Sequence, residues 1–381
     1  MKKKVLIIAP ISKRGGRELE TGFIASILSN TYDVSVVSTS NYYANSQINE
    51  FSGFSFTSLN LLVFKNSFIV RIVLFVAALL KSNLNFNSNT LNSPTIKKIV
   101  GIENRKRQVL YEQIDKASVV FICAQVYSNY IPEVLNYTKK KNLPVIFRTT
   151  GTIYDDSRLN KLDWVQQVDV FLHHSNANAK RLYKVYTTPY YIIDQCAVNE
   201  NNLLNIPVRE AVVSSFLILS RLAPEKQIET VIRTFNKLKH KLFIYGDGLE
   251  EEKLKKLVIS DNIIFGGYVE NKELHKVFSV VDCLIISSKE EAGPLSAIES
   301  MAAGVVIIST KVGAMLERLP AYDFWYDGSE NNLEEVIIKI RTLKKDQIKK
   351  KSLELREHYI KNFSLQIIAN KYLEAVESVI V

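Results

Sequence analysis

The sequence is poor in the residues that build disulfide frameworks and thiolate metal centres. Its three cysteines, Cys123, Cys196 and Cys283, lie far apart and form no Cys-x-x-Cys pair. This spacing argues against a disulfide-stapled domain and against a cysteine-ligated metal. We therefore expect a protein of a reducing compartment, the cytoplasm.

Histidines and chelating aspartates are also scarce. The five histidines show no metal-ligand spacing, and no Asp-x-Asp pair, a common chelator of divalent ions, occurs. Paired histidines at a strand end, such as His173 and His174, are more often structural than catalytic. We expect no bound metal and no cofactor.

Long hydrophobic runs are missing as well. The run Val5–Ala9 is too short for a signal-peptide core and is typical of a first buried strand. Arg71 interrupts the strongly apolar run Phe68–Leu80, and Lys81 ends it. Because a membrane span needs about 20 apolar residues, neither run predicts a transmembrane helix.

Acidic residues are outnumbered, which gives a formal net charge of +10. The basic clusters 105–107, 139–141 and 349–351 suit anionic partners such as lipid headgroups, nucleotide phosphates or nucleic acid. Solvated helix ends and loops explain the same clusters equally well. Since no nucleic-acid-binding motif joins them, we expect no nucleic-acid partner.

With 381 residues, the chain is longer than one hydrophobic core usually serves, so two domains are expected. Apolar runs separated by helix-length segments predict parallel strands covered on both faces. The expected strands are Val5–Ala9, Val34–Ser38, Val119–Cys123, Val145–Phe147 and Val170–Leu172, then Phe216–Ser220, Leu242–Tyr245, Ile263–Phe265, Cys283–Ile286 and Val305–Ile308.

The chain thus reads as two doubly wound α/β domains. The polar segment Asn199–Ile206, followed by Pro207, suggests the linker. We predict an N-terminal domain over 1–205 and a C-terminal domain over 206–361. A closing helix over about 362–381 has one apolar face to bury.

The most informative segment runs from Ser287 to Glu317. A strand feeds a short loop, and Gly293 and Pro294 then open a helix. The free backbone N–H groups of a helix N-terminus can hold a phosphate or a carboxylate. Glu291 lies in the loop and Glu299 inside the helix, so the two carboxylates can serve different parts of one ligand; ordinary solvated acids are the competing interpretation.

Three further loops follow predicted strands. Arg221 and Lys226 lie where open α/β sheets bind ligands, and this pair suits a diphosphate. The turn at Gly246 lacks the third glycine of a dinucleotide fingerprint and the lysine of a P-loop. Gly15 and Gly16 permit close backbone approach by a ligand, although a plain turn is equally compatible with them.

Together these segments resemble the retaining GT-B glycosyltransferases of family 4, the group 1 glycosyl transferases. The likeness is clearest in SRLAPEKQIETVIRTF, YGDGLEEEKLKKL, IIFGGYVENKELHKVFSVVDCLIISS and EEAGPLSAIE, between Phe216 and Glu317. The resemblance implies two Rossmann-like domains that face each other across a cleft, with the closing helix packed back on the first domain.

The resemblance also implies a role for each matched position. The catalytic residues would be Arg221, Lys226 and Glu291. Arg221 and Lys226 would hold the donor diphosphate and stabilise its charge as the glycosidic bond breaks, and Glu291 would contact the sugar. Glu299 would bind the ribose hydroxyls. The remaining donor-binding positions would be Gly15, Gly16, Gly246, Tyr268, Val269, Gly293, Pro294 and Leu295.

Two departures from the family pattern affect these expectations. The family usually has Glu-Gly-Phe-Pro where this chain has Glu291-Ala292-Gly293-Pro294, which leaves the donor sugar open. Many members carry a histidine near the acceptor after a strand like Val145–Phe147. Here the segment reads Arg148-Thr149-Thr150-Gly151, which leaves the acceptor side poorly defined.

The expected function is transfer of a sugar from a nucleoside-diphosphate sugar to an acceptor hydroxyl with retention. The acceptor would be a glycan or lipid-linked glycan, as in polysaccharide or lipopolysaccharide assembly, compatible with peripheral contact at the inner membrane face. A nucleotide-sugar epimerase or isomerase on the same fold, and a non-catalytic binding partner, remain alternatives.

Overall fold

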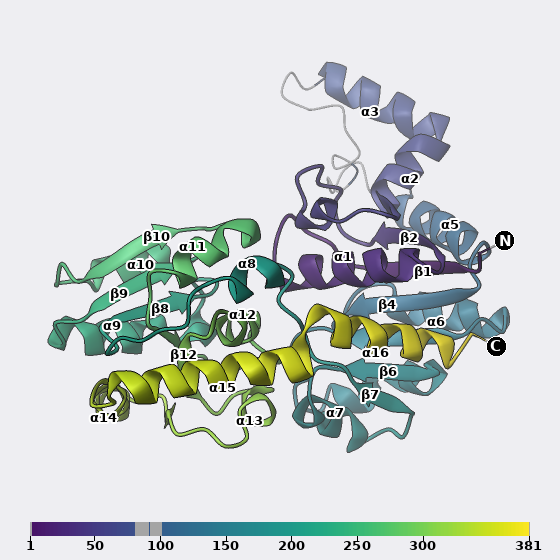
Figure 1. Cartoon of the computed structure of the whole chain (residues 1–381). Coiled ribbons are helices and arrows are strands. Elements are labelled where there is room, and N and C mark those ends of the chain that lie inside the picture. Colours follow the sequence, from purple (N-terminus) through teal and green to yellow (C-terminus); the bar gives the residue numbers. More distant parts are fainter. Residues whose placement is uncertain (1, 81–90, 92–100, 381) are drawn as a thin grey trace. The chain divides into compact units, whose positions relative to one another are not determined.

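The computed structural model describes residues 2–80, 91 and 101–380. The chain forms two compact units (Figure 1). Unit 1 comprises Met1–His173, Ala179–Ile193 and Ala369–Val381, and unit 2 comprises His174–Asn178 and Asp194–Ile368. Each unit is built around its own parallel sheet.

In its described part, unit 1 contains a seven-stranded parallel sheet with strand order β3-β2-β1-β4-β5-β6-β7. The central strands are apolar and buried along their whole length, as expected for strands with helices on both faces. The strands are β1 (Lys4–Ala9), β2 (Asp33–Ser38), β3 (Ser55–Ser58), β4 (Val119–Ala124), β5 (Val145–Thr149), β6 (Val170–His173) and β7 (Tyr190–Ile192).

The helices of unit 1 bury the apolar residues that recur at helical spacing, such as Leu19, Phe23 and Leu28 on α1. These helices are α1 (Gly16–Ser29), α2 (Leu59–Asn66), α3 (Phe68–Leu80), α5 (Ile102–Ile114) and α6 (Ile131–Lys140). Helix α7 (Asn176–Tyr183) begins in unit 2 and ends in unit 1, and α16 (Leu365–Glu377) does the same.

A buried polar network attaches α16 to the core of unit 1. Arg148, at the end of β5, is fully buried and donates two hydrogen bonds to Oε1 of Glu20 on α1. The Tyr372 hydroxyl of α16 donates to the same oxygen at 3.1 Å. Because an uncompensated buried charge is costly, all three partners hold one another in place.

The described part of unit 2 contains a six-stranded parallel sheet with strand order β10-β9-β8-β11-β12-β13. Neighbouring strands run in register, as in the pairs Phe216 with Leu242 and Leu284 with Ile307. The strands are β8 (Ser215–Leu219), β9 (Lys241–Tyr245), β10 (Ile263–Gly267), β11 (Cys283–Ile286), β12 (Val306–Thr310) and β13 (Trp325–Tyr326).

Helices cover both faces of this sheet, and α15 packs on α12. Besides short 3-10 turns, of which η5 (Pro224–Lys226) and η6 (Asn271–Glu273) matter most, the helices are α8 (Glu200–Leu204), α9 (Ile228–Lys237), α10 (Glu251–Lys256), α11 (Leu274–Phe278), α12 (Leu295–Ala303), α13 (Met315–Arg318), α14 (Glu330–Arg341) and α15 (Lys345–Phe363).

The predicted fold class, two doubly wound parallel-sheet domains, is confirmed, and all ten expected strands are present. Three short strands at sheet edges, β3, β7 and β13, were not expected from the sequence. The segment Asn199–Ile206, which suggested a linker, contains α8 and belongs to unit 2. Its Leu203 is fully buried, and its Glu200 accepts a hydrogen bond from the Tyr359 hydroxyl at 2.6 Å. The compact units therefore divide at Asp194, earlier than the predicted 205/206 boundary.

Within the described residues, no single helix is long and apolar enough to cross a membrane. One bent pair of helices, α2 with Phe68–Val76 of α3, passes that test only in combination, with an angle of 97° between its two parts.

Candidate active site

Two loops at the carboxyl edge of the unit 2 sheet hold a partly buried ion pair. Lys226 ends η5, which follows β8, and its ammonium group contacts the carboxylate of Glu291, in the loop after β11. Only 8% of Lys226 is exposed to solvent. The Ser288 hydroxyl also donates to this carboxylate, at 3.3 Å. Thus two residues that lie 65 positions apart in the sequence meet at one site.

Backbone contacts fix these two loops to each other. The Ser287 hydroxyl donates to the carbonyl oxygen of Lys226 at 2.6 Å, and the Lys289 amide donates to the carbonyl of Glu225 at 2.8 Å. The ion pair is therefore held by its loops as well as by its charges. A cavity of about 440 Å³ opens beside it, lined among others by Gln227, Ser288, Lys289, Lys311 and Trp325.

Arg221 occupies a different environment from Lys226. Its side chain is largely exposed and pairs with Glu225, at 3.0 Å. No contact joins Arg221 to Lys226 or Glu291 in the described structure. An exposed guanidinium can change its rotamer at little cost, so Arg221 remains available to an incoming anion.

Gly246 follows β9 and is required by its surroundings. A side chain there would place Cβ at 1.8 Å from the carbonyl oxygen of Ser220, and the residue has a positive φ of 137°. Its amide donates to Gly267 at the end of β10, at 2.8 Å. Gly246 thus lets the loops after β8, β9 and β10 pack closely; a contact to a ligand stays a prediction.

Glu299 is buried, which excludes the interpretation that it is a solvated surface acid. It lies on α12 with 3% of its surface exposed, and its Oε1 accepts a hydrogen bond from Nδ2 of Asn271 at 3.1 Å. Burial raises the pKa of Glu299 to about 7, and the bond from Asn271 opposes this rise. A buried carboxyl with a single side-chain donor retains unused acceptor capacity.

Arg318 contacts the backbone of the loop before α12. The sequence analysis did not identify this residue. Arg318 is fully buried, and its Nη1 donates to the carbonyl oxygen of Pro294 at 2.6 Å. A side chain at Gly293 would place Cβ at 2.7 Å from Nη2 of Arg318. Pro294 is the N-cap of α12 and Leu295 is the first helical residue, so the helix begins one residue later than the sequence predicted.

Asp194 compensates the charge of Arg318. The two carboxylate oxygens accept from Nε and Nη2 at 2.8 and 2.6 Å, and Gln195 accepts from Nη2 at 3.2 Å. This bidentate geometry is the strongest form of an Arg–carboxylate contact. Asp194 and Gln195 are the residues at which the chain enters the long segment of unit 2.

Tyr268 and Val269 follow β10 directly. Tyr268 is partly exposed, whereas Val269 packs against the core of unit 2. Asn271, the partner of Glu299, begins η6 only a few residues later. The segment therefore places a ring, an aliphatic side chain and the Glu299 contact in one short stretch of chain.

In unit 1, Gly15 and Gly16 form the start of α1. Gly15 has a φ of 142°, its amide donates to Oε1 of Gln47 at 2.8 Å, and Gly16 is the first helical residue. The next residue, Arg17, donates from Nε to the hydroxyl of Thr150 at 3.2 Å. A cation thus lies beside the segment in which a family histidine was expected.

The neighbouring Thr149 contacts His173. Its hydroxyl lies 2.8 Å from Nδ1 of His173, and the imidazole stacks on Phe171. Burial, with a smaller effect of Arg148, lowers the pKa of His173 to about 3. A histidine that stays neutral and packed in the core fits the structural role expected from the sequence.

No cluster of histidine, cysteine, aspartate and glutamate that could hold a metal ion occurs among residues 2–80, 91 and 101–380.

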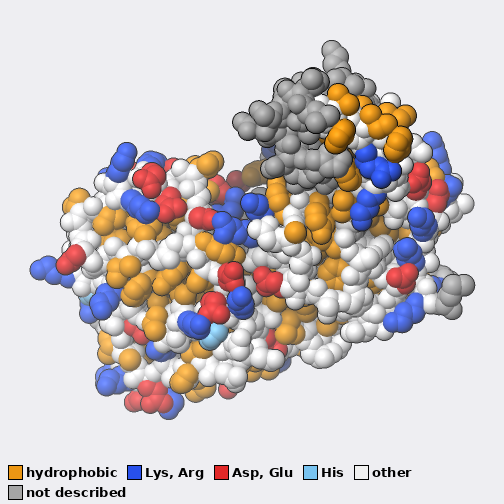
Figure 2. Space-filling model, turned by 90° about the horizontal axis from the view of Figure 1, so that it is seen from above, with side chains coloured by type: hydrophobic (Ala, Val, Ile, Leu, Met, Phe, Trp, Pro, Cys, Tyr) orange, Lys and Arg blue, Asp and Glu red, His pale blue; other side chains and the backbone are white. Residues whose placement is uncertain are grey.

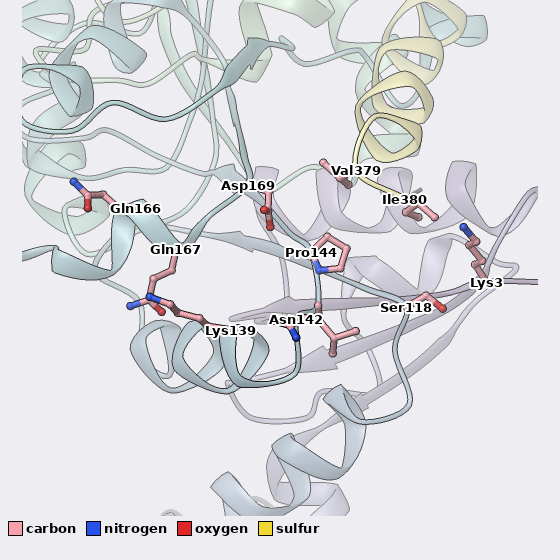
Figure 3. Close-up of a pocket in the computed structure, with 11 residues that line it drawn as sticks. Lys3, Ser118, Lys139, Asn142, Pro144, Gln166, Gln167, Asp169, Val379 and Ile380 are labelled. Carbon is pink, nitrogen blue, oxygen red and sulfur yellow. The ribbon is translucent and has the colours of Figure 1, made fainter.

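A second cavity, of about 640 Å³, lies at the amino edge of the unit 1 sheet (Figure 3). Its lining residues Lys3, Ser118, Pro144 and Asp169 precede strands β1, β4, β5 and β6. Since α/β sheets bind ligands at the carboxyl edge, this cavity is not part of the candidate site.

Residues 213–364 match the family model of the glycosyl transferases group 1. The matched segment contains Arg221, Lys226, Glu291 and Glu299, and also Arg318, which contacts the loop before α12. The resemblance seen in the sequence is thereby confirmed for this part of the chain.

The sulfoquinovosyl transferase of Arabidopsis thaliana is 25% identical over 133 residues, which are 34% of this chain and 26% of that protein. The chain thus matches about a quarter of this relative.

Solved structures extend the likeness in fold to both units. A glycosyltransferase from Rickettsia africae has a TM-score of 0.73 at 18% identity, covering 99% of this chain and 98% of that one. Anabaena HepE, solved with UDP and glucose, has a TM-score of 0.70 at 12% identity and covers 99% and 100%. The whole chain therefore has the GT-B type of fold.

Sequence reasoning missed Arg17, Asp194, Asn271 and Arg318. Each of them contacts a residue that is distant in the sequence. Only Asn271 lies in one of the segments that carry the family resemblance. For Asn271, its position in a polar turn before α11 was the available signal. Arg318 closes a four-residue helix and looks like an ordinary surface cation in the sequence.

The raised pKa of Glu299 makes the stability of the protein depend on pH in a defined direction. Between its ordinary value of 4.5 and about 7, the folded state keeps a proton that the unfolded chain has lost. The free energy of unfolding therefore falls as pH rises through this window. Relative to Glu299→Gln, the free energy of unfolding of the wild type should fall by up to about 3 kcal/mol between pH 5 and pH 8. Urea unfolding of both proteins measures this difference, and identical pH dependence would contradict it.

Arg318 should control the order of the loop from Glu291 to Leu295. Arg318→Lys keeps the charge but loses the fork that joins Asp194 to Pro294, so the loop amides should exchange hydrogen roughly tenfold faster. The matched control is Arg356→Lys, because Arg356 donates to Ala302 and Ala303 at the other end of α12. Mass-spectrometric hydrogen exchange resolves both ends. If Arg318→Lys does not fold, Asp194→Asn is the milder variant. Equal acceleration of loop hydrogen exchange in the tested variant and in the Arg356→Lys control would refute the role of Arg318.

Proposed function

We propose that this protein transfers a sugar from a nucleoside-diphosphate sugar to an acceptor hydroxyl, with retention of the anomeric configuration. The observation that carries the proposal is the meeting of Lys226 and Glu291, with the buried Glu299 on the adjoining helix, at the carboxyl edge of the unit 2 sheet. The family of residues 213–364 supports the same conclusion.

Each part of such a donor would have a complementary partner in unit 2. The ribose hydroxyls would donate to Glu299, whose acceptor capacity Asn271 only partly uses. The diphosphate would lie at the N-terminus of α12, between Lys226 and the exposed Arg221. The base would lie against the segment of Tyr268 and Val269, and the backbone from Gly293 to Leu295 would line the sugar.

The ion pair provides Lys226 with a partner that a ligand can replace. In the structure, the carboxylate of Glu291 compensates the charge of Lys226. A bound diphosphate competes for the ammonium group, which frees Glu291 to accept hydrogen bonds from sugar hydroxyls. Binding of the donor thus replaces one anionic partner of Lys226 by another and does not leave a buried charge without compensation.

The reaction breaks the bond between the anomeric carbon and a phosphate oxygen and forms a bond to the acceptor oxygen. The proton of the acceptor hydroxyl passes to the released nucleoside diphosphate. Negative charge grows on that diphosphate as the bond breaks, and Lys226, Arg221 and the N-terminus of α12 would stabilise it. We propose that these groups act without a metal ion.

From unit 1 we propose Gly15 and Gly16 as further donor-binding positions. On the acceptor side we propose Arg17, which donates to the Thr150 hydroxyl, as a cation. A cationic residue near the acceptor suits a phosphorylated or otherwise anionic glycan. We propose a glycan or lipid-linked glycan as acceptor, and a cytoplasmic protein that works at the inner face of the membrane.

Replacing Lys226 by alanine should lower kcat by roughly two to three orders of magnitude, the usual effect of losing one charge-stabilising donor at a reaction centre. The matched control is Lys253→Ala, because Lys253 also pairs with glutamates, Glu229 and Glu250, but on the exposed surface of unit 2. The rate of sugar release or transfer is measured for both variants. Near-normal turnover of a folded Lys226→Ala protein would remove Lys226 from the mechanism.

The product distinguishes this reaction from other chemistry on the same fold. A panel of nucleotide sugars and glycan acceptors is incubated with the protein, and NMR identifies the product and its anomeric configuration. A new glycosidic bond with the donor's configuration supports the proposal. An altered sugar still attached to its nucleotide would mean an epimerase or isomerase, and inversion would refute retention.

A further inference from the structure

Helix α3 is apolar on two opposite faces. Val70 and Leu74, one helical turn apart, are buried in the core of unit 1. On the other side, Phe68, Ile69, Ile72, Phe75 and Val76 are between 45% and 68% exposed. A surface helix normally presents polar side chains to water, so the outer face of α3 departs from the expected pattern.

These five residues form one contiguous stripe, which we name the α3 outer face. Their spacing of one, three and four positions places them along one side of the helix. Figure 2 shows apolar side chains gathered over this helix with basic side chains next to them. A contiguous exposed apolar patch of this kind marks a surface that has a partner.

The sequence segment that contains α3 carries charges of one sign. Between Glu50 and Glu103 it contains no aspartate or glutamate, while five positions are basic: Lys65, Arg71, Lys81, Lys97 and Lys98. Of these, Lys65 and Arg71 are exposed, and the Arg71 guanidinium lies over the Phe68 ring, 5.7 Å from its centre. Arg105 lies nearby and donates to Ser67, just before α3.

We propose that the α3 outer face docks on the surface of an anionic lipid bilayer. Apolar side chains flanked by exposed lysine and arginine, in a sequence segment without any acid, match a membrane interface, where the rings and aliphatic groups enter the acyl boundary and the cations meet the headgroups. A protein partner of ordinary composition would place acids against these cations, but the lack of acids over 52 consecutive residues of this chain favours a surface that is anionic throughout. Docking would bring unit 1, with Gly15 and Arg17, to acceptors that are anchored in the membrane; this last consequence rests on the proposed function.

Vesicle co-sedimentation of the full chain tests the docking without any assay of transfer. The probes are vesicles of phosphatidylcholine alone and of an equal mixture of phosphatidylcholine and phosphatidylglycerol. The wild type should bind the mixed vesicles at least tenfold more tightly than the neutral ones, and added salt should weaken binding.

The decisive variant is Phe68→Ser combined with Ile72→Ser, which should reduce binding to the mixed vesicles at least tenfold. Both side chains are exposed, so the thermal unfolding of the variant should remain close to that of the wild type. The matched control is Ile338→Ser combined with Ile360→Ser, since these isoleucines are similarly exposed on α14 and α15 of unit 2. This control should bind as the wild type does.

Three results would overturn the proposal: no binding of the wild type, equal binding of the α3 variant, or equal loss in the unit 2 control. A wild-type dimer in sedimentation equilibrium that the α3 variant abolishes would assign the face to a second copy of the chain instead. A failure of sugar transfer with intact vesicle binding would refute the proposed function alone.

Discussion

The contact of Arg318 with Asp194 and Pro294 is the constraint on which the candidate site depends. A guanidinium with no exposed surface is tolerable only with its charge compensated and its donors satisfied, and Asp194, Gln195 and the Pro294 carbonyl fulfil both conditions. The same contact fixes the backbone at the start of α12 and leaves room at position 293 only for glycine. In the segment Glu291-Ala292-Gly293-Pro294, the glycine is the residue that lies against the Arg318 guanidinium.

The charged side chains near this loop of unit 2 suit an anionic ligand that carries hydroxyl groups. Lys226 is compensated by Glu291, and Glu299 is buried with a single donor and a raised pKa. Perturbed carboxyls and paired charges at one edge of a sheet are typical of functional sites. Burial lowers the local dielectric, so each contact made to a ligand here counts for more than it would at the surface.

The parts of this structure that follow from local sequence patterns could be predicted, and the parts that depend on distant contacts could not. The central strands were recognisable because strands covered on both faces are continuous apolar runs, as in VVFICA of β4. The edge strands β3 and β7 are short, partly exposed and, in β3, polar, so no such pattern marks them. Helix α8 escaped because its five residues bury little besides Leu203, and its polar composition resembles that of a loop.

In the candidate site, the loops that carry Lys226 and Glu291 follow strands β8 and β11, as the sequence predicted, and Glu299 lies on the helix that comes next. The direct pairing of Lys226 with Glu291, the burial of Glu299 and the clamp by Arg318 are set by tertiary packing and have no local signature. The apolar run of α3 was compatible with core packing, and only the structure separates its buried residues Val70 and Leu74 from its exposed face.

Titration of nucleotide sugars into the purified protein tests the central claim, that unit 2 binds the nucleotide-sugar donor through Glu299, most directly. UDP-, GDP- and ADP-sugars are compared by calorimetry in the presence of EDTA, with the wild type and with Glu299→Ala. We predict that one nucleotide class binds without metal and that the substitution weakens this binding at least tenfold, since a carboxylate that accepts from both ribose hydroxyls is lost. Binding of none of the three classes, or equal affinity in the two proteins, would contradict the claim.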